Sequence, residues 1–449
     1  MSTAIVILAA GKGTRMVSDL PKALHKIGHA TLLEHAMRAA FALKPEKIIV
    51  VVGHQAKMVA DAAREINNAV VIAEQKEQLG TAHAVSQAEK ALSGFNGDIL
   101  ILYADTPFIE PETINSIKKA RKKADLVVLG FETTDPARYG RIITVGHDIR
   151  KIVEFKDASE TERKLTLCNS GVLAGAASLI FSLIAQIKNE NAASEYYLTD
   201  CIELAKAQGK SAIVVRCSEE ETLGINSRQD LALAEAEFQK KARKNHMQNG
   251  VTLLAPETVF FALDTEIGPD TIVEQNVVFG PDVIISSGAK IKSFSHLEGA
   301  HVSEGAIVGP FARLRPGSEI GAKARVGNFV EVKKAVIGDK SKINHLSYIG
   351  DATIGMETNI GAGSVTCNYD GVMKHQTTIG DGAFIGSNTM MVAPITIGKD
   401  AMTASGSVIT KDVPEAALAL GRGTQENKPR LARKLMKILK QRKQKKDIG

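Results

Sequence analysis

Short apolar runs alternate with amphipathic segments over the first half of the chain, to about residue 227. The runs are rich in β-branched residues, as in AIVILAA (4–10), KIIVVVG (47–53), AVVIAEQ (69–75), DILILYAD (98–105) and ADLVVLGFE (124–132). Strands that are buried on both faces show such near-continuous apolar patterns. Between them lie segments such as Ala56–Asn67, whose apolar residues recur at helical spacing. The alternation predicts a doubly wound, mostly parallel α/β sheet.

A long polar segment follows, and its spacing predicts one helix over Arg228–Asn249. Ser227 can serve as its N-cap, with Asp230 three positions on as the reciprocal partner. Gly250 is a plausible C-terminal stop. A helix that is polar on most sides is typical of a connection between two domains, so we expect a linker here.

The hydrophobic period changes to six from Ile267 onward. Aliphatic positions recur at this spacing, with occasional five-residue steps, as far as Ile409, and 22 of the 24 positions are apolar, the other two being Thr366 and Thr403. Neither a helix nor an ordinary strand has this period over such a length. Three hexads close one coil of a triangular parallel β-helix, in which each aliphatic residue points inward and stacks on its equivalent one coil away. The second half is therefore predicted to be a solenoid.

One stretch of the solenoid departs from the six-residue repeat. Residues 366–378, TCNYDGVMKHQTT, carry polar, aromatic and glycine residues where the repeat needs small or aliphatic ones. Insertions in solenoids form loops on one face, which is often the binding face. We expect this loop to serve a site.

Composition and charge exclude several classes of protein. Apolar residues make up 44% and charged residues 24% of the 449, as in ordinary globular proteins. The net charge of +6 is concentrated at the C-terminus, where residues 427–449 hold ten Lys or Arg and one acid, leaving about −3 for the rest. The body is therefore not predicted to bind nucleic acid, and the tail reads as a solvated basic extension whose Leu431, Leu435, Ile438 and Leu439 recur at helical spacing.

The cysteines and the N-terminus favour a cytoplasmic protein. Cys168, Cys201, Cys217 and Cys367 form no CxxC pair, which is typical of a reducing compartment without a disulfide framework or zinc site. The first apolar run lacks a basic n-region and leads into a glycine-rich loop, unlike a signal peptide. No run approaches the roughly 18 residues of a membrane span.

A glycine-rich turn after the first strand is the first candidate for chemistry. VILAAGKGTRM (6–16) places Gly11 and Gly13 where backbone N–H groups can wrap a phosphate chain, although turn glycines are common. Arg15 and Lys22 add positive charge, and Pro21 stiffens the loop that presents Lys22. This combination suits a nucleoside triphosphate.

Two polar side chains end later strands of the same sheet. Gln75 has the donor and acceptor atoms that a base edge needs, although a plain helix N-terminus at Gly80-Thr81 explains that segment equally well. Asp105 lies at a carboxyl strand end, where open α/β sheets bind ligands, and a lone carboxylate there suits Mg²⁺ or simply caps a turn. Gly140, Glu154 and Asn169 offer groups for sugar hydroxyls, and Asn226 offers a second metal ligand; each signal is weak alone.

The order of these motifs resembles a known family. LAAGKGTRM followed by PK is similar to the signature loop of the sugar-1-phosphate nucleotidyltransferases. With QLGTAH (78–83), EYYLTD (195–200), LRPG (314–317), GNFVE (327–331), NHLSY (344–348) and CNYDG (367–371), the chain to about Arg422 resembles the bacterial bifunctional N-acetylglucosamine-1-phosphate uridyltransferase / glucosamine-1-phosphate acetyltransferase family. The resemblance implies a Rossmann-like nucleotidyltransferase domain, a linker helix and a left-handed parallel β-helix of hexapeptide repeats. It also implies a homotrimer that shares its acetyltransferase sites between neighbouring subunits.

The resemblance implies roles for residues of the first half. Lys22 and Arg15 would neutralise the triphosphate, and Asp105 and Asn226 would carry Mg²⁺. UTP and the product sugar nucleotide would be held by Leu8, Ala9, Ala10, Gly11, Lys22, Gln75, Gly80, Thr81, Tyr103, Gly140, Glu154, Asn169 and Asn226. Ala104 stands where the family pattern has Gly.

His345 is the candidate base of the second half. Transfer of an acetyl group from a thioester to an amine needs a group that takes a proton near neutral pH, and His is the natural choice. A histidine tolerated at a solenoid corner is the plain alternative. Ile343 and Ile349 should fill the inward positions, which leaves His345 and Tyr348 outside the core. Arg315 and Lys333, 18 residues apart and so one coil apart, should stack on one face and suit a sugar phosphate.

The resemblance implies the remaining roles. His345 is the implied general base for acetyl transfer. Glucosamine-1-phosphate would be held by Arg315, Lys333, Tyr348, Asn359 and Lys374. Acetyl-CoA would be held by Ala362, Asn368, Tyr369, Ser387, Ser405 and Arg422, and at Ser405 the family pattern has Ala.

The predicted organisation has four parts: a uridyltransferase domain over residues 1–227, a linker helix over 228–250, an acetyltransferase β-helix over 251–425 and a basic tail over 426–449. The expected substrates are UTP, acetyl-CoA, glucosamine-1-phosphate and N-acetylglucosamine-1-phosphate. Two alternatives stay open: a monofunctional sugar-1-phosphate nucleotidyltransferase with a regulatory or oligomerising β-helix, and a non-catalytic nucleotide-sensing scaffold. The first predicts no coordinated His, Arg and Lys in the hexads, and the second predicts loss of Lys22, Asp105 or His345.

Overall fold

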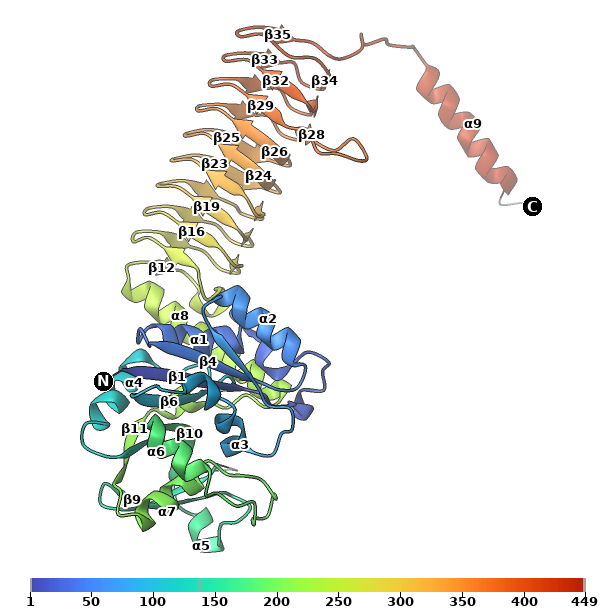
Figure 1. Cartoon of the computed structure of the whole chain (residues 1–449). Helices are drawn as coiled ribbons and strands as arrows, with labels where there is room; N and C mark the ends of the chain where they lie inside the picture. The colour runs from blue at the N-terminus through green and yellow to red at the C-terminus, as the bar shows by residue number, and fades with distance from the viewer. Residues whose placement is uncertain (1, 137–138, 447–449) are drawn as a thin grey trace. The chain divides into compact units, whose positions relative to one another are not determined.

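The computed structural model describes residues 2–136 and 139–446, which divide into two compact units (Figure 1). Unit 1 comprises the residues up to Asn245 together with Phe260–Leu263. Unit 2 comprises His246–Val259 and the residues from Asp264 on. Within residues 2–136 and 139–446, no helix is long and apolar enough to cross a membrane.

A nine-stranded sheet lies at the centre of unit 1, in the order β5-β4-β1-β6-β10-β7-β11-β9-β8. Its strands are β1 (Thr3–Ala9), β4 (Lys47–Val52), β5 (Val71–Glu74), β6 (Asp98–Tyr103), β7 (Leu126–Glu132), β8 (Arg141–Val145), β9 (Asp148–Val153), β10 (Leu167–Ala176) and β11 (Ala212–Cys217). The five apolar runs correspond to β1, β4, β5, β6 and β7, as predicted. Neighbours among β5, β4, β1 and β6 are parallel, whereas β10 is antiparallel to β6 and β7, and β8 and β9 form a hairpin.

Helices on both faces of this sheet give unit 1 two apolar cores. On β1, Ala4, Val6 and Leu8 join one core, and Ile5, Ile7 and Ala9 join the other. Residues of α3, α6 and α7 pack in the first core, and residues of α1, α2 and α4 pack in the second. The helices are α1 (Leu32–Phe41), α2 (Ala56–Ile66), α3 (Thr81–Ser86), α4 (Pro111–Ala120), α5 (Glu160–Arg163), α6 (Ala177–Ile184), α7 (Asp200–Ala207) and α8 (Arg228–Gln248). Short 3-10 turns are η1 (Thr14–Met16), η2 (Lys22–Leu24), η3 (Lys90–Leu92) and η4 (Glu219–Thr222), and β2 (Lys26–Ile27) pairs with β3 (Ala30–Thr31).

The long helix α8 begins at the predicted capping box. The Ser227 hydroxyl accepts a hydrogen bond from the Asp230 amide (3.2 Å), and the Asp230 carboxylate accepts one from the Ser227 amide (2.8 Å). The helix is more than a polar connection, because Ala234 and Phe238 pack in an apolar cluster with Ile27. A Cβ at Gly28, whose φ is +52°, would clash with the Phe238 ring, so the glycine permits this packing.

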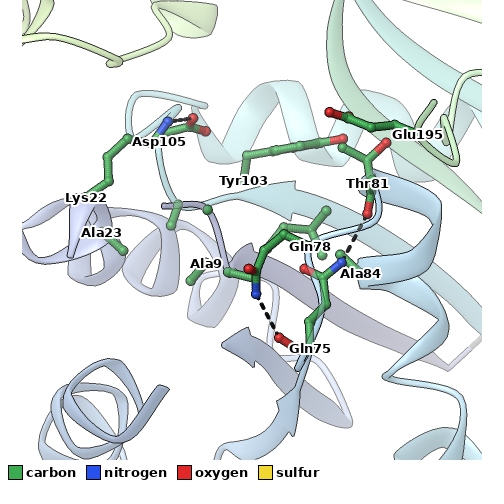
Figure 2. A pocket seen from close by; sticks show the side chains of 15 residues that line it. Ala9, Lys22, Ala23, Gln75, Gln78, Thr81, Ala84, Tyr103, Asp105 and Glu195 are labelled. Carbon is green, nitrogen blue, oxygen red and sulfur yellow. Dashed lines mark hydrogen bonds and ion pairs between the residues drawn. The ribbon is translucent and has the colours of Figure 1, made fainter. Parts of the chain in front are cut away.

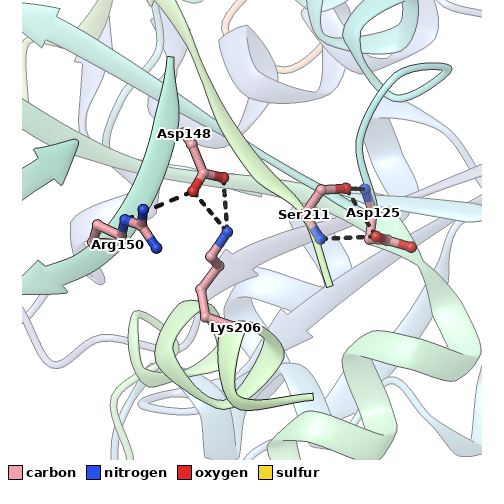
Figure 3. A network of polar contacts seen from close by, with 5 residues as sticks. All are labelled: Asp125, Asp148, Arg150, Lys206 and Ser211. Carbon is pink, nitrogen blue, oxygen red and sulfur yellow. Dashed lines mark hydrogen bonds and ion pairs between the residues drawn. The ribbon is translucent and has the colours of Figure 1, made fainter. Parts of the chain in front are cut away.

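Two groups of polar contacts join elements in the half of the sheet that contains β7, β9 and β11 (Figure 3). The Asp125 carboxylate, just before β7, accepts hydrogen bonds from the Ser211 amide (2.9 Å) and hydroxyl (2.8 Å), just before β11. These bonds lower the pKa of Asp125 and hold the two strand starts together. The Asp148 carboxylate, on β9, accepts hydrogen bonds from Lys206 Nζ of α7 (2.7 and 2.8 Å), with Arg150 nearby.

Unit 2 is a left-handed parallel β-helix with three faces. The first face holds β12 (Thr252–Leu253), β14 (Ile272–Val273), β17 (Lys290–Ile291), β20 (Ile307–Val308), β23 (Arg325–Asn328), β25 (Lys342–His345), β27 (Asn359–Ile360), β30 (Phe384–Ile385), β33 (Met402–Thr403) and β35 (Leu418–Ala419). The second holds β15 (Val278–Phe279), β18 (His296–Leu297), β21 (Arg313–Leu314), β28 (Val365–Cys367), β31 (Met390–Val392) and β34 (Val408–Ile409). The third holds β13 (Glu266–Ile267), β16 (Val283–Ile285), β19 (Ala300–Val302), β22 (Ser318–Ile320), β29 (Thr377–Ile379) and β32 (Ile395–Ile397). The longer β24 (Glu331–Ile337) and β26 (Tyr348–Ile354) run round the corner between the second and third faces.

The six-residue period is a core period, as the sequence predicts. All of the 24 hexad positions are buried except Ile267, which is half-buried in the first coils. Each coil pairs with the next in parallel, so that Ile343 stacks between Val326 and Ile360. A repeating apolar column of this kind fixes the register of every outward side chain. Unit 2 also contains η5 (Pro256–Thr258), and α9 (Leu431–Lys446) lies within the basic tail.

Candidate active sites

The glycine-rich loop of unit 1 brings Lys22 back to the carboxyl end of β1. Gly13 has a φ of +59°, and a Cβ there would lie 2.7 Å from the Cβ of Lys22. Only glycine accommodates this left-handed turn against so close a neighbour without strain. The loop 10–16 and the turn η2 therefore meet above the strand end, as expected of a phosphate-binding loop.

A cavity of about 240 Å³ lies at the carboxyl ends of β1, β5 and β6 (Figure 2). Nine predicted nucleotide-binding residues line it: Leu8, Ala9, Ala10, Gly11, Lys22, Gln75, Gly80, Thr81 and Tyr103. Asp105 lines it as well, so β1 and β6 deliver the loop, the lysine and the carboxylate to one place. Ligands bind at this edge in open α/β sheets. Leu8 and Tyr103 are 95 positions apart in the sequence and meet here because β1 and β6 are neighbours in the sheet.

The side-chain amide of Gln75 is held in one orientation. Gln75 is buried, and its Nε2 donates to the Gly80 carbonyl (3.2 Å) and to His83 Nδ1 (3.1 Å). These two bonds use both amide protons, which leaves Oε1 as the acceptor. The cavity thus has a fixed hydrogen-bond acceptor in its wall.

Gly80 opens helix α3 in a conformation that only glycine adopts readily. Its φ is +121°, and a Cβ there would lie 2.5 Å from the Tyr196 carbonyl oxygen. The Tyr196 carbonyl in turn accepts a hydrogen bond from the Ala82 amide (3.0 Å), and the Leu198 amide donates to the Thr81 hydroxyl (3.0 Å). The EYYLTD segment and the start of α3 are therefore joined by backbone contacts around the cavity.

Lys22, Asp105 and Asn226 meet from three distant parts of the chain. Lys22 Nζ forms an ion pair with Asp105 Oδ2 and donates a hydrogen bond to Asn226 Oδ1 (3.0 Å). Asn226 is held by its backbone amide, which donates to Asp230 Oδ2 (2.9 Å) at the start of α8. Asn226 does not line the cavity itself but contacts Lys22 at its edge.

A second cavity, of about 220 Å³, shares Thr81 and Tyr103 with the first. Gly140, Glu154 and Asn169, the predicted sugar-binding residues, line it. Burial raises the pKa of Glu154, and Thr199 Oγ1 donates to its Oε1 (3.2 Å). Burial, with Glu154 and Asp105 close by, raises the pKa of Tyr103 as well, so its hydroxyl stays a hydrogen-bond donor.

The predicted residue Arg15 lies outside both cavities, and several residues that line the cavities were not predicted. Arg15 faces solvent on η1 and lines neither of the two cavities within the described residues. Sequence reasoning missed Ala23, Gln78, Ala84 and Glu195 in the first cavity, and Tyr139 and Thr199 among those of the second. Gln78, Glu195 and Thr199 belong to the QLGTAH and EYYLTD motifs, so the motifs themselves were the available signal.

On the β-helix, His345 ends β25 and points away from the core. Ile343 and Ile349 are fully buried, whereas His345 is exposed and Tyr348 is half-buried. The Asn328 side chain, one coil earlier, has its Oδ1 2.7 Å from His345 Nδ1 and accepts the Nδ1 proton. The bond leaves His345 Nε2 as the acceptor nitrogen, which is the form that a general base needs.

Three cations gather beside this histidine's coil. Leu314 pairs with Val332, so Arg315 and Lys333, the next residues, stand on successive coils of one face, as predicted. Lys374 approaches from the irregular loop, and its contact with Lys333, together with Arg315, lowers the pKa of Lys333. Arg315 is paired with Glu331 (2.7 Å), which offsets part of this positive charge. A cluster of three cations has the charge that a phosphate dianion needs for binding.

The irregular loop is braced by its own contacts. Asp370 pairs with His375 (2.6 Å), and this bond, with the Met373 and Val372 amides, holds the pKa of Asp370 far below its usual range. A bridge between Tyr369 and Lys374 closes the loop. At its base, a Cβ at Gly350 would collide with the Tyr348 hydroxyl and with Asn368 Nδ2, so these two side chains lie over that glycine.

The predicted acetyl-CoA residues follow one corner of the β-helix. The Gly363 amide donates to the His345 carbonyl (3.3 Å), and the Asn388 amide donates to the Ala362 carbonyl (2.7 Å). Further along, Arg422 Nη1 donates to the Ser405 carbonyl (2.9 Å), and the Gly406 amide donates to the Ser387 carbonyl (2.8 Å). Successive coils therefore carry Ala362, Ser387 and Ser405 in a row that starts beside His345. Asn359, on β27, pairs with Lys342 on the coil before.

Comparison with known proteins covers both halves of the chain. The MobA-like NTP transferase domain matches residues 5–179, and the bacterial transferase hexapeptide (six repeats) matches residues 376–411. The bifunctional protein GlmU of Ruegeria sp. (strain TM1040) is 61% identical over 449 residues, all of each chain. Those of Jannaschia sp. (strain CCS1) and Roseobacter denitrificans are each 57% identical, over 97% and 100% of this chain and 96% and 100% of theirs.

The chain belongs to the GlmU family. A solved UDP-glucose pyrophosphorylase complexed with UDP-glucose is 20% identical, covers 54% of this chain and all of its own, and has a TM-score of 0.44, a likeness that carries no argument. Both domains that match this GlmU-family chain are transferase domains, so the protein is an enzyme with a transferase in each half.

Nucleotidyl transfer of the GlmU type uses a divalent cation. Two oxygen atoms, Asp105 Oδ2 and Asn226 Oδ1, converge on one cation, the Lys22 ammonium. Few protein oxygens, completed by phosphate oxygens and water, are the ligand set that small hard cations accept. The residues present therefore fit such an ion. No cluster of three or more His, Cys, Asp or Glu suited to a metal occurs in the described residues.

The two residues at which the sequence differs from the expected family pattern, Ala104 and Ser405, fall in the candidate sites. Ala104 is buried and lines the first cavity, where its amide donates to the Leu8 carbonyl (3.0 Å). The backbone bond is one that either Gly or Ala makes. Ser405 contacts Arg422 through its carbonyl, so that contact is also independent of the side chain.

Proposed function

We propose that this chain carries out two consecutive steps in the synthesis of a nucleotide sugar. Unit 2 transfers an acetyl group from acetyl-CoA to the amine of glucosamine-1-phosphate. Unit 1 transfers a uridylyl group from UTP to N-acetylglucosamine-1-phosphate and releases pyrophosphate. The likeness to bifunctional relatives over the full length carries this proposal, since it spans the regions of both candidate sites.

In unit 1, a phosphate oxygen of the sugar phosphate attacks the α-phosphorus of UTP in line, and pyrophosphate leaves. The attacking phosphate is already a nucleophile, so no protein base is required. Lys22 and the backbone amides of loop 10–13 would neutralise and orient the triphosphate, which is the main source of catalysis in phosphoryl chemistry. Glu154, Asn169 and Gly140 would hold the sugar in the adjoining cavity, which meets the first at Thr81 and Tyr103.

The resident metal would be Mg²⁺, held by Asp105 and Asn226. When bound, it would supply charge neutralisation to the phosphates. Lys22 contacts both of these side chains, so in that state its ammonium would turn to phosphate oxygens instead. Arg15, exposed on η1, would contribute positive charge from the loop.

The fixed amide of Gln75 supports selection of uracil. Uracil presents an N3–H donor, and Gln75 Oε1 is the acceptor left after Gly80 and His83 bind Nε2. Cytosine has an unprotonated N3 at the same place and would face oxygen with a lone pair. In a buried site, cytosine would lose this hydrogen bond and would place one acceptor against another. Such a mismatch discriminates strongly between uracil and cytosine.

In unit 2, His345 Nε2 would take a proton from the attacking amine as the new amide bond forms. The CoA thiolate leaves and is protonated. Arg315, Lys333 and Lys374 would bind the sugar phosphate, with Tyr348 and Asn359 contributing hydrogen bonds. Asn368, Tyr369, Ala362, Ser387, Ser405 and Arg422 would line the acetyl-CoA site.

A homotrimer with shared acetyltransferase sites is the proposed assembly. Phe294, Phe311 and Phe329 stack on successive turns, with ring centroids 4.8 and 5.2 Å apart, and all three are exposed. Leu346, beside His345, is exposed on the next coil, where its amide donates to the Asn328 carbonyl (3.0 Å). An exposed apolar column next to a site suits contact with a second copy. Phe311→Asp should lower the molar mass measured by light scattering and weaken acetyl transfer more than uridylyl transfer.

The proposed domain limits are residues 1–227 for the uridyltransferase, 228–250 for the linker helix, 251–425 for the acetyltransferase and 426–449 for the tail. The proposed location is the cytoplasm. Four free cysteines, two of them buried, support a reducing compartment.

The decisive experiment incubates the purified chain with UTP, acetyl-CoA, glucosamine-1-phosphate and Mg²⁺. We expect both free CoA thiol and pyrophosphate. Pyrophosphate formed only when N-acetylglucosamine-1-phosphate is supplied, with no thiol release, would favour the monofunctional enzyme with a regulatory β-helix. Neither product from either substrate would favour the non-catalytic scaffold and overturn the proposal.

A further inference from the structure

Helix α9 in the basic tail has a composition unlike the rest of the chain. Its 16 residues, Leu431–Lys446, include eight Lys or Arg and no Asp or Glu. The only acid of the tail beyond residue 427 is Asp447, which lies outside the described residues. Neither proposed reaction uses this helix.

Four of the apolar residues of α9 form one stripe, and Met436, which is also exposed, lies outside it. Leu431, Leu435, Ile438 and Leu439 are spaced i, i+4, i+7 and i+8, which places them on one side of a helix with about 3.6 residues per turn. Arg433, Lys437 and Lys440 fall on the opposite side by the same arithmetic. Each of the four apolar side chains is more than a third exposed, from 37% for Ile438 to 55% for Leu439.

A stripe and a basic face together point to a specific kind of partner. A solvated extension needs the charge but gains nothing from a row of exposed leucines. Nucleic acid takes up the charge but offers no apolar layer for the stripe. An anionic bilayer takes up both, since its phosphates attract Lys and Arg while the stripe enters the boundary between headgroups and acyl chains.

We propose that α9 lies flat on the surface of an anionic lipid bilayer and anchors the chain there reversibly. The stripe of Leu431, Leu435, Ile438 and Leu439 would face the acyl chains, and the basic face would contact lipid phosphates. The last four residues of the helix, 443–446, include three Lys by sequence, which adds to the electrostatic attraction. One such helix per chain binds weakly, so an oligomer would bind through several at once.

The test is co-sedimentation of the full-length chain with vesicles of phosphatidylcholine that contain phosphatidylglycerol. We expect the chain to sediment with these vesicles at low salt and not with pure phosphatidylcholine. Binding should fall as salt is raised, because the screening length shrinks from about 30 Å at 0.01 M to about 3 Å at 1 M. The double variant Leu435→Asp, Ile438→Asp should bind about tenfold more weakly or worse.

A matched control separates the stripe from the change in net charge. Leu233→Asp with Met58→Asp introduces the same two carboxylates at exposed apolar positions of α8 and α2. It should bind vesicles nearly as well as the unaltered chain. Both double variants should retain both activities in the absence of lipid.

Three results would overturn the membrane proposal. The unaltered chain could fail to sediment with anionic vesicles, or the Leu435→Asp, Ile438→Asp variant could bind as well as the unaltered chain. A lower molar mass for that variant in solution would show that a second copy, and not a bilayer, covers the stripe.

Discussion

The two candidate sites of this chain are built in opposite ways. In unit 1 the side chains enclose cavities of about 240 and 220 Å³, and Gln75 and Glu154 are held in place by neighbours. On the β-helix, His345 and Tyr369 are exposed, and their positions come from the repeating coil beneath them. A site buried among strand ends is shaped by local contacts, whereas a site on a solenoid is placed by register. Substitutions should therefore affect the two regions separately.

The largest expected effect separates the two activities at the β-helix. His345→Ala removes the nitrogen that would accept the amine proton, and we expect acetyl transfer to fall by about 10²–10⁴-fold. Uridylyl transfer should be unchanged, because its site lies in unit 1. Release of CoA thiol and of pyrophosphate measures the two rates. His296→Ala, an exposed histidine three coils earlier on β18, is the matched control, and equal loss of both activities in His345→Ala would defeat the two-site account.

The converse substitution acts on unit 1. Asp105→Ala removes one of the two oxygen ligands proposed for the cation and the partner of Lys22. We expect uridylyl transfer to fall by about 10²–10³-fold, with acetyl transfer intact. Asp61→Ala, which removes an exposed carboxylate on α2, should leave both rates unchanged. A wild-type rate of pyrophosphate release in Asp105→Ala would remove this residue from the proposed site.

A smaller effect tests how the buried site selects its base. Gln75→Leu keeps the approximate volume but removes the acceptor that faces the cavity. We expect the preference for UTP over CTP, measured as the ratio of kcat/KM values, to fall by about tenfold or more. Thiol release from acetyl-CoA should stay the same. An unchanged preference would assign base selection to some other group.

The smallest effect concerns charge burial, which distinguishes unit 1 from the exposed β-helix site. Burial raises the pKa of Asp200, at the start of α7, to about 6. A raised pKa in the folded state means that the native protein holds this proton more tightly than the unfolded chain does. The contribution of protonated Asp200 to the free energy of unfolding is therefore fully present below the unfolded pKa near 3.9, and it is lost as the pH rises through about 6. The unfolding temperature of Asp200→Asn minus that of the unaltered chain should therefore rise between pH 5 and pH 8. Asp61→Asn is the exposed control, for which this difference should stay constant. A difference that falls for Asp200→Asn over this pH interval would contradict the raised pKa of Asp200.

The architecture of both units could be predicted because periodicity reports burial directly. The hexads fixed which residues point inward, and the apolar runs matched five strands of the sheet. The antiparallel β10 and the β8–β9 hairpin were missed, since their apolar patterns do not state the direction of pairing. The packing of Phe238 over Gly28 was also missed, because a mostly polar helix gives little sign of one buried aromatic contact.

Site residues were predictable where a motif placed them at a strand end or a coil corner. The cavity brings Lys22, Gln75 and Asp105 together as the strand order requires. The Asn328 contact with His345 was not foreseen, because it depends on a coil of 17 rather than 18 residues at that point. Gln78 and Glu195 were missed because a motif does not show which of its side chains point into the cavity. Contacts of this kind depend on exact backbone paths that periodicity does not determine.

We propose that one chain carries two independent active sites linked only by a diffusing intermediate. The direct test supplies UTP, acetyl-CoA, glucosamine-1-phosphate and Mg²⁺ to His345→Ala, to Asp105→Ala and to an equal mixture of the two proteins, and measures pyrophosphate. We expect almost none from either variant alone, because one lacks the acetylated substrate and the other cannot use it. The mixture should release pyrophosphate at a substantial fraction of the unaltered rate. A mixture as inactive as its components would contradict the account.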